Sequence, residues 1–278
     1  MVAYPYYPNE QYGMIYYLPV SGPISTLPRY VHCPDTFMDT VKRPTGQDKA
    51  SVVKNAKYFD ANERYANKVG ALDTYRNIRS AIGPEIAGSE ILLDVGNGGV
   101  FDYDTSLAKR IVGVDLCFDG DNPLQLDEHI TLRWGDALAL DEPDAAYDRV
   151  LEVSVFHHLI GNDVDSTFAN IGRAIEEAHR VLALGGRLVV MESCISERAF
   201  MIERRLFGAL RRLAQTPLMG HPATLQFPPQ AIARAIRDRF GNVTVASIPL
   251  GRWVIQFGVR MPSALTPVRA YMFTATRC

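Results

Sequence analysis

The stretch Leu92-Leu93-Asp94-Val95-Gly96-Asn97-Gly98-Gly99 decides the fold of this 278-residue chain. Its apolar first half predicts a short strand that is buried on both faces. Its glycines let the chain reverse tightly and bring backbone N–H groups close to a ligand, as nucleotide-binding turns do. The stretch therefore predicts a Rossmann-like α/β domain with a ligand site at this turn.

The turn departs from the pattern that reads a dinucleotide. That fingerprint is G-x-G-x-x-G, and Gly96 and Gly98 satisfy its first two positions, whereas Phe101 stands where the third glycine belongs. A pyrophosphate ligand, and with it a nicotinamide-dependent dehydrogenase, is disfavoured.

Short apolar runs on both sides of the turn predict the remaining strands. They alternate with turns and helical stretches, which is typical of βαβ units in a mostly parallel sheet. The predicted strands are 91–93, 111–114, 130–132, 150–153 and 188–191, with 243–248, 254–259 and 270–274 completing the sheet.

Apolar residues at three- and four-residue steps predict the helices. One covers 57–82 and ends at Gly83-Pro84, and another covers 167–184 and ends at Gly185-Gly186. A lid insertion at 194–240 contains a helix near 200–213 and a helix opened by Pro228-Pro229. The Tyr- and Pro-rich residues 1–56 are expected to form an arm or lid packed on the body, and 57–278 the domain itself.

Bulk composition limits the partners. The chain has 29 basic and 31 acidic residues, so it lacks the basic surface that nucleic acid requires. Its four cysteines form no Cys-x-x-Cys pair, and no apolar run is long enough to span a membrane. We expect a cytoplasmic protein with a small-molecule substrate and no nucleic-acid or membrane partner; a homodimer is left open.

Three acids follow three successive predicted strands: Asp94, Asp115 and Asp136. An acid at the tip of the second strand, here Asp115, suits the two hydroxyls of a ribose. Asp136 suits an exocyclic amine such as that of adenine, because a carboxylate only accepts hydrogen bonds. The pattern points to an adenosine ligand.

In combination these motifs resemble the class I S-adenosylmethionine-dependent methyltransferases over about residues 57–192. The resemblance rests on the turn at 92–98, on Gly113-Val114-Asp115, Gly135-Asp136-Ala137, Tyr147-Asp148-Arg149-Val150, His157-His158-Leu159 and the segment 181–188. It implies a seven-stranded sheet with a reversed last hairpin and S-adenosylmethionine as the cofactor.

The same resemblance implies a cofactor site, residue by residue. Asp94, Gly96, Asn97 and Gly98 would lie near the methionine moiety, Asp115 with Leu116 at the ribose, and Asp136 with Ala137 at the adenine. Glu152, Val153 and Ser154 would lie against the cofactor, and the segment at Tyr58 would close over it.

Two features depart from the family pattern. Val100 replaces a customary glycine, and Asp102, Tyr103 and Asp104 delay the next helix to about Thr105. The turn-rich connection 116–129 predicts a loop where the family has a helix.

Three residues beyond the fourth and fifth strands are candidates for catalysis. His157 and His158 lie where the family's pocket opens, and a histidine suits proton removal near neutral pH. Glu192, at the end of the fifth strand, is a candidate to bind a polar substrate. No spacing suggests a metal site. The Arg-rich segment 197–212 is open to three interpretations: a solvated helix face, a lid for an acidic substrate, or an interfacial helix.

Methyl transfer to a small-molecule acceptor, through O or N rather than C, is the leading functional hypothesis. One alternative is an enzyme of the same fold that cyclises the cofactor or transfers its aminocarboxypropyl group. Another is a non-catalytic protein that binds S-adenosylmethionine.

Overall fold

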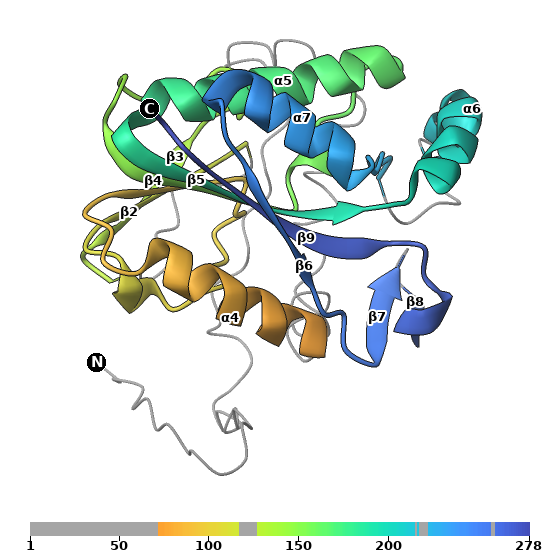
Figure 1. Ribbon diagram of the computed structural model, residues 1–278, viewed down its shortest axis with the longest axis horizontal. Helices are drawn as coiled ribbons and strands as arrows, with labels where there is room; N and C mark the ends of the chain where they lie inside the picture. Colours follow the sequence, from red (N-terminus) through yellow and green to blue (C-terminus); the bar gives the residue numbers. More distant parts are fainter. Residues whose placement is uncertain (1–71, 117–126, 215, 217–221, 257–258) are drawn as a thin grey trace, which may run out of the picture. The chain divides into compact units, whose positions relative to one another are not determined.

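The computed structural model describes residues 72–116, 127–214, 216, 222–256 and 259–278, and in them a seven-stranded sheet forms the centre (Figure 1). Its strand order is β3-β2-β1-β4-β5-β9-β6. The strands are β1 (Leu92–Val95), β2 (Ile111–Asp115), β3 (Ile130–Trp134), β4 (Tyr147–Val153), β5 (Leu182–Cys194), β6 (Thr244–Ile248) and β9 (Arg269–Thr276).

The first five strands run parallel, and the last hairpin reverses. Strand β1 lies between β2 and β4, with Leu92 beside Ile111 and Val95 beside Glu152. Strand β9 is antiparallel to both β5 and β6. The carboxyl ends of β1 to β5 therefore meet at one edge of the sheet. The predicted seven-stranded sheet with a reversed hairpin is confirmed.

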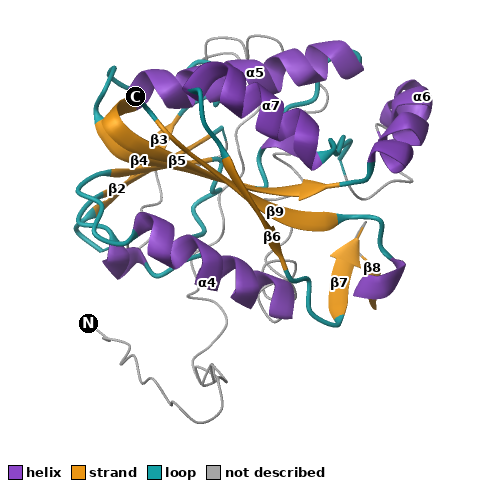
Figure 2. Ribbon diagram, in the orientation of Figure 1, coloured by secondary structure: helices purple, strands orange, loops and turns teal. Residues whose placement is uncertain are grey.

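Helices cover both faces of the sheet. Figure 2 shows α4 (Asp73–Ile86) on one face and α5 (Val164–Val181) with α7 (Pro229–Phe240) on the other, while α6 (Glu197–Ala214) follows β5. Alternate residues of each strand feed two apolar layers, as in β4, where Val150 packs with α5 and Leu151 packs with α4. Burying each such side chain stabilises the fold by about 1.5 to 3 kcal/mol. Within the described residues no helix is long and apolar enough to cross a membrane.

Neither Gly83-Pro84 nor Gly185-Gly186 ends a helix as predicted. Helix α4 continues through Gly83 and Pro84 to Ile86. A proline there removes only one backbone hydrogen bond, and the fully buried Ile82 and Ile86 hold the last turn against the core.

Helix α5 ends at Val181, and Gly185 and Gly186 lie inside β5, the strand that follows it. The Gly185 N–H donates to the Arg277 carbonyl at 2.8 Å. A Cβ on Gly186 would lie only 2.8 Å from the Ala183 carbonyl oxygen, so this stretch of strand requires the glycine for packing.

The strand predicted at 254–259 does not join the main sheet. Instead β7 (Trp253–Gln256) and β8 (Val259–Pro262) form a separate antiparallel hairpin, and β6 pairs directly with β9. The other two predicted C-terminal strands are β6 and β9. The expected helix from Thr105 is a single 3-10 turn, η2 (Thr105–Leu107). The arm 1–56, Tyr58 and most of the connection 116–129 lie outside the described residues.

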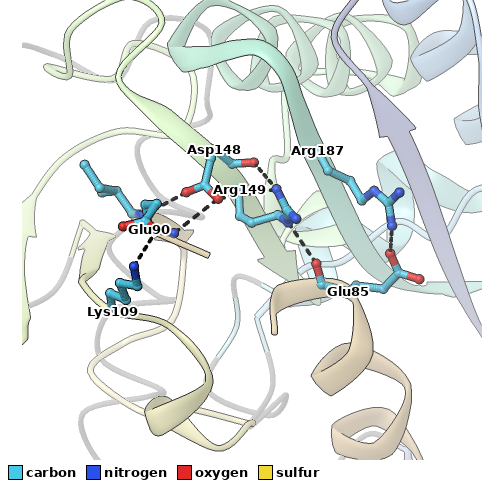
Figure 3. A network of polar contacts seen from close by, with 7 residues as sticks. Glu85, Glu90, Lys109, Asp148, Arg149 and Arg187 are labelled. Carbon is cyan, nitrogen blue, oxygen red and sulfur yellow. Dashed lines mark hydrogen bonds and ion pairs between the residues drawn. The ribbon is translucent and has the colours of Figure 1, made fainter. Parts of the chain in front are cut away.

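A polar network fixes the amino-terminal edge of the sheet (Figure 3). The Asp148 carboxylate accepts from the Ile91 N–H at 2.7 Å and so holds the start of β1 against β4. The Arg149 Nε donates to the Glu85 carbonyl at 3.0 Å, and Arg187 pairs with the Glu85 carboxylate at 2.5 Å. These contacts tie α4 to β4 and β5 at the edge opposite the carboxyl ends.

Candidate active site

The turn after β1 is built by its glycines. Gly96, Gly98 and Gly99 have φ angles of 78°, 57° and 82°, in the left-handed region that favours glycine. The Gly96 N–H donates to the Val114 carbonyl at 2.7 Å. A Cβ on Gly96 would lie 2.6 Å from Cγ2 of Val155, so any larger residue collides with the segment after β4.

Asn97 links this turn to two strands. Its Nδ2 donates to Asp94 Oδ2 at 3.1 Å, and its Oδ1 accepts from the Gly99 N–H at 2.9 Å. A Cβ on Gly113 of β2 would lie 2.7 Å from Asn97 Nδ2. The glycine in β2 therefore makes room for the asparagine of the turn.

Asp94 is buried at the end of β1 and is 2% exposed. The Tyr103 hydroxyl donates to its Oδ2 at 2.8 Å. Burial raises the pKa of Asp94 to about 7, against the opposing effect of hydrogen bonds from Asn97 and Tyr103. Sequence reasoning missed the role of Tyr103, because the acidic stretch 102–104 that contains it indicates only a delay of the next helix.

The other two acids of the predicted set lie at the end of β2 and just after β3. Asp115 is partly exposed, and its Oδ2 accepts from the Gly98 N–H at 2.9 Å, so it contacts the turn directly. Asp136 is buried, and its Oδ1 accepts from the Leu138 N–H at 2.9 Å. Leu116 and Ala137 follow them and are half-buried.

Glu152 is the most isolated acid of the site. It is 2% exposed at the end of β4, and its Oε2 has no hydrogen-bond partner among the described residues. Burial raises its pKa to about 8, and the charges of Glu192 and Asp94 add to the effect. Val153 is half-buried, and Ser154 takes a left-handed φ of 59° with its N–H donating to the Met191 carbonyl.

His157 and Glu192 form a contact across 35 residues of sequence. His157 belongs to the 3-10 turn η3 (Phe156–His158), and its Nδ1 lies 2.6 Å from Glu192 Oε1. The Ser193 N–H also donates to Oε1 at 2.6 Å. When Glu192 is a carboxylate, which only accepts, and the His157 ring is neutral, Nδ1 carries the hydrogen and Nε2 is the acceptor. The His158 ring packs on that of His157, with centroids 4.1 Å apart.

Two further residues lie near this pair, and sequence reasoning missed both. Tyr271 of β9 stands opposite Glu192 in the antiparallel register, a pairing that puts both side chains on one face. Glu203 of α6 is close enough to His157 for the histidine's charge to lower its pKa, although burial raises that pKa overall to about 7. The Leu225 N–H donates to the His157 carbonyl at 3.1 Å and ties the segment after α6 to η3.

The structure thus brings together two groups of predicted residues at the carboxyl edge of the sheet. One group is the turn with its acids, and the other is the set Glu152, His157, His158 and Glu192. No group of three or more His, Cys, Asp and Glu in the described parts of the chain is arranged to hold a metal ion.

Comparison with known proteins identifies the domain. Residues 93–190 match the methyltransferase domain family. A candidate methyltransferase of Encephalitozoon cuniculi is 34% identical over 113 residues, which are 40% of this chain and 50% of that protein. The chain spans about half the length of this curated relative.

Two solved structures share the fold at low sequence identity. An S-adenosylmethionine-dependent methyltransferase of Thermotoga maritima has a TM-score of 0.53 at 15% identity, covering 82% of this chain and 100% of its own. A candidate methyltransferase of Haloferax volcanii, solved with the Trm112 methyltransferase activator, has a TM-score of 0.50 at 14% identity, covering 84% of this chain and 99% of its own. Residues 93–190 therefore match a methyltransferase domain, and the strand order of the sheet is that of the class I, Rossmann-like methyltransferase fold.

Proposed function

We propose that this protein transfers the methyl group of S-adenosylmethionine to a small-molecule acceptor through an oxygen or nitrogen nucleophile. The observation that carries the proposal is the His157–Glu192 pair, which lies at the same sheet edge as the glycine turn and its acids. A base is needed when the nucleophile starts protonated, as hydroxyl and ammonium groups do. The proposal favours oxygen or nitrogen over carbon because these nucleophiles give the His157–Glu192 pair a proton to remove.

The residues of the turn fit the cofactor. The left-handed glycines leave the backbone open to close approach, and Asp115 offers carboxylate oxygens for the hydroxyls of a ribose. The buried Asp94 and Glu152 favour a ligand with positive charge, because a cation relieves the cost of ionising carboxyl groups away from water. Asp136 and Ala137 would hold the adenine, Leu116 would flank the ribose, and Glu152, Val153 and Ser154 would lie along the methionine end.

The proposed chemistry divides between positioning and proton removal. Bound S-adenosylmethionine supplies an electrophilic methyl group on a sulfonium. His157 Nε2 takes the proton of the acceptor, and Glu192 holds the ring in the tautomer that leaves Nε2 free to accept. Alignment of the acceptor with the methyl group by itself supplies much of the rate in such displacements. His158 supports the ring of His157 by packing against it.

Product analysis tests the proposal. The full chain is incubated with S-adenosylmethionine and a panel of small alcohols, phenols and amines, and the nucleoside products are identified by mass spectrometry. We expect S-adenosylhomocysteine together with a methylated acceptor. Methylthioadenosine as the product would instead show cleavage at the aminocarboxypropyl arm, and tight cofactor binding without turnover of any acceptor would support a non-catalytic role.

A further inference from the structure

Helix α6 exposes an apolar stripe that no described residue covers. One side of the helix is anchored, because Phe207 and Ala214 are buried and the Phe200 ring packs on Phe227 with centroids 5.2 Å apart. Figures 1 and 2 show the helix beyond the end of β5, apart from the two helix layers of the sheet. Among the residues that the structure describes, none covers the other side of the helix.

The stripe is continuous along the helix. Its members follow at steps of four, four and three residues, which places them on one side of an α-helix. They are Ile202, Leu206, Leu210 and Leu213, with exposed fractions of 62%, 50%, 43% and 43%; Met201, which precedes Ile202 in the sequence, is 57% exposed. The exposed side of a helix in water is usually polar, so a run of aliphatic side chains marks a contact surface.

Arginines accompany the stripe. Arg198, Arg205 and Arg212 recur every seven residues, are exposed, and lie along one side of the apolar stripe. Arg204 lies elsewhere on the helix and pairs with Asp165 at 3.6 Å. Helix α6 contains five arginines and two glutamates, one of which, Glu203, is turned toward the protein interior. The exposed surface of α6 is therefore both apolar and cationic.

We propose that α6 is an interfacial helix that docks this protein on an anionic lipid surface. Aliphatic side chains next to a row of arginines match the boundary between acyl chains and acidic headgroups, where the leucines enter the apolar layer and the guanidinium groups pair with phosphates. The side chains of Glu203 and Phe207 stay packed against the rest of the protein in this arrangement, so docking requires no unfolding. The helix lies on the membrane and does not span it.

The composition of the surface favours a lipid over other occupants. A second copy of the chain would bring the arginine row against an equally cationic surface. The stripe has no exposed tryptophan, tyrosine or phenylalanine among Glu197–Ala214, and protein–protein interfaces usually concentrate their binding energy in such aromatic anchors. Binding to a bilayer does not require aromatic anchors of this kind.

Vesicle cosedimentation of the full chain tests the proposal. Vesicles of phosphatidylcholine alone are compared with vesicles that also contain phosphatidylglycerol, at low and at high salt. We expect binding to the anionic vesicles that weakens as salt rises. The triple variant R198Q/R205Q/R212Q should lower the partition coefficient by on the order of 100-fold. The double variant L206S/L210S should lower it by about tenfold or more.

Matched controls identify the surface. Leu184 and Leu265 are 76% and 70% exposed but lie outside α6, so L184S and L265S should leave partitioning unchanged. The proposal is overturned if the wild type does not bind anionic vesicles at low salt, or if the control variants reduce binding as much as L206S/L210S. It is also overturned if the α6 variants abolish a dimer seen by sedimentation velocity and leave vesicle binding intact, because a second copy would then be the occupant.

Discussion

The two halves of the candidate active site are held in place by different kinds of contact. The turn after β1 is held by local contacts, since Asn97, Gly99 and Tyr103 all lie within ten residues of Asp94. The half proposed to be catalytic joins His157 to Glu192 of β5, and its surroundings include residues of α6 and β9. The first half constrains the backbone, whereas the second relies on side chains that tertiary structure brings together.

This difference predicts how each half responds to substitution. Substitutions in the turn after β1 should strain the backbone and weaken cofactor binding. Substitutions in the half built from side chains should leave cofactor binding intact and lower turnover, because we propose that its groups act on the acceptor.

The largest effect is expected at His157. Replacing it with alanine removes the proposed base and should lower kcat by about 10² to 10⁴-fold. The Kd of S-adenosylmethionine should stay within a few-fold of the wild type. His158→Ala is the matched control, because its ring packs on His157 whereas the contact with Glu192 is made by His157, and it should retain most of kcat. Equal losses in both variants would show that the pair shapes the loop only.

In the turn after β1, Gly96→Ala should lower the free energy of unfolding. An alanine at φ 78° costs about 1 to 2 kcal/mol in backbone strain, and its Cβ would overlap Val155 at about a further 1 to 3 kcal/mol. Chemical denaturation measures the total. Gly88→Ala provides the comparison, because Gly88 has φ 74° and a Cβ there would have nothing within 4 Å, so this variant reports strain alone. If both variants are destabilised equally, the contact with Val155 contributes nothing.

Asp115→Ala should weaken cofactor binding by about 1 to 3 kcal/mol, the size expected when hydrogen bonds to a charged acceptor are lost. Calorimetric titration gives the value. Asp141→Ala, an exposed acid outside the turn, should leave the affinity unchanged. An Asp115→Ala affinity equal to that of the wild type would rule out the ribose assignment.

An effect that depends on pH is expected at Glu152 in the ligand-free protein. Its folded pKa of about 8 lies above its ordinary value, so the folded state favours the protonated acid. Its contribution to stability is complete below about pH 4.5 and is lost as the pH rises through 8. Glu152→Gln cannot ionise, so its stability relative to the wild type should rise by about 3 to 5 kcal/mol between pH 5 and pH 9, at about 1.4 kcal/mol per unit of pKa difference.

Denaturation at the two pH values measures this difference. Glu176→Gln, at an exposed helix position, should show no pH-dependent change. A Glu152→Gln effect of the same size at pH 5 and pH 9 would show that burial does not hold this carboxyl in its protonated form.

Much of the fold could be predicted because its signals are local. Buried apolar runs mark β1 to β5, and the turn glycines mark the end of β1. Gly185 and Gly186 mislead the prediction because a glycine that ends a helix and a glycine that lets strands approach closely look alike in sequence. The prediction that 254–259 belongs to the main sheet is wrong because strand composition does not reveal a strand's partner.

For the candidate site, the sequence indicates which residues take part better than it indicates which of them contact each other. His157 and Glu192 both stand out in the sequence, yet no spacing rule connects residues that far apart. Tyr271 and Glu203 carry no signal, because each owes its position to how β9 and α6 pack. Residues that act through backbone conformation leave a sequence pattern, and residues that act through tertiary proximity do not.

Calorimetric titration of the full chain with S-adenosylmethionine, S-adenosylhomocysteine and NAD tests the central claim most directly. A turn with left-handed glycines, acids at the neighbouring strand ends and no third dinucleotide glycine should bind one equivalent of S-adenosylmethionine. S-adenosylhomocysteine should compete for the same site, and NAD should give no heat. Binding of NAD in place of S-adenosylmethionine would contradict the account. So would the absence of binding by both S-adenosylmethionine and S-adenosylhomocysteine.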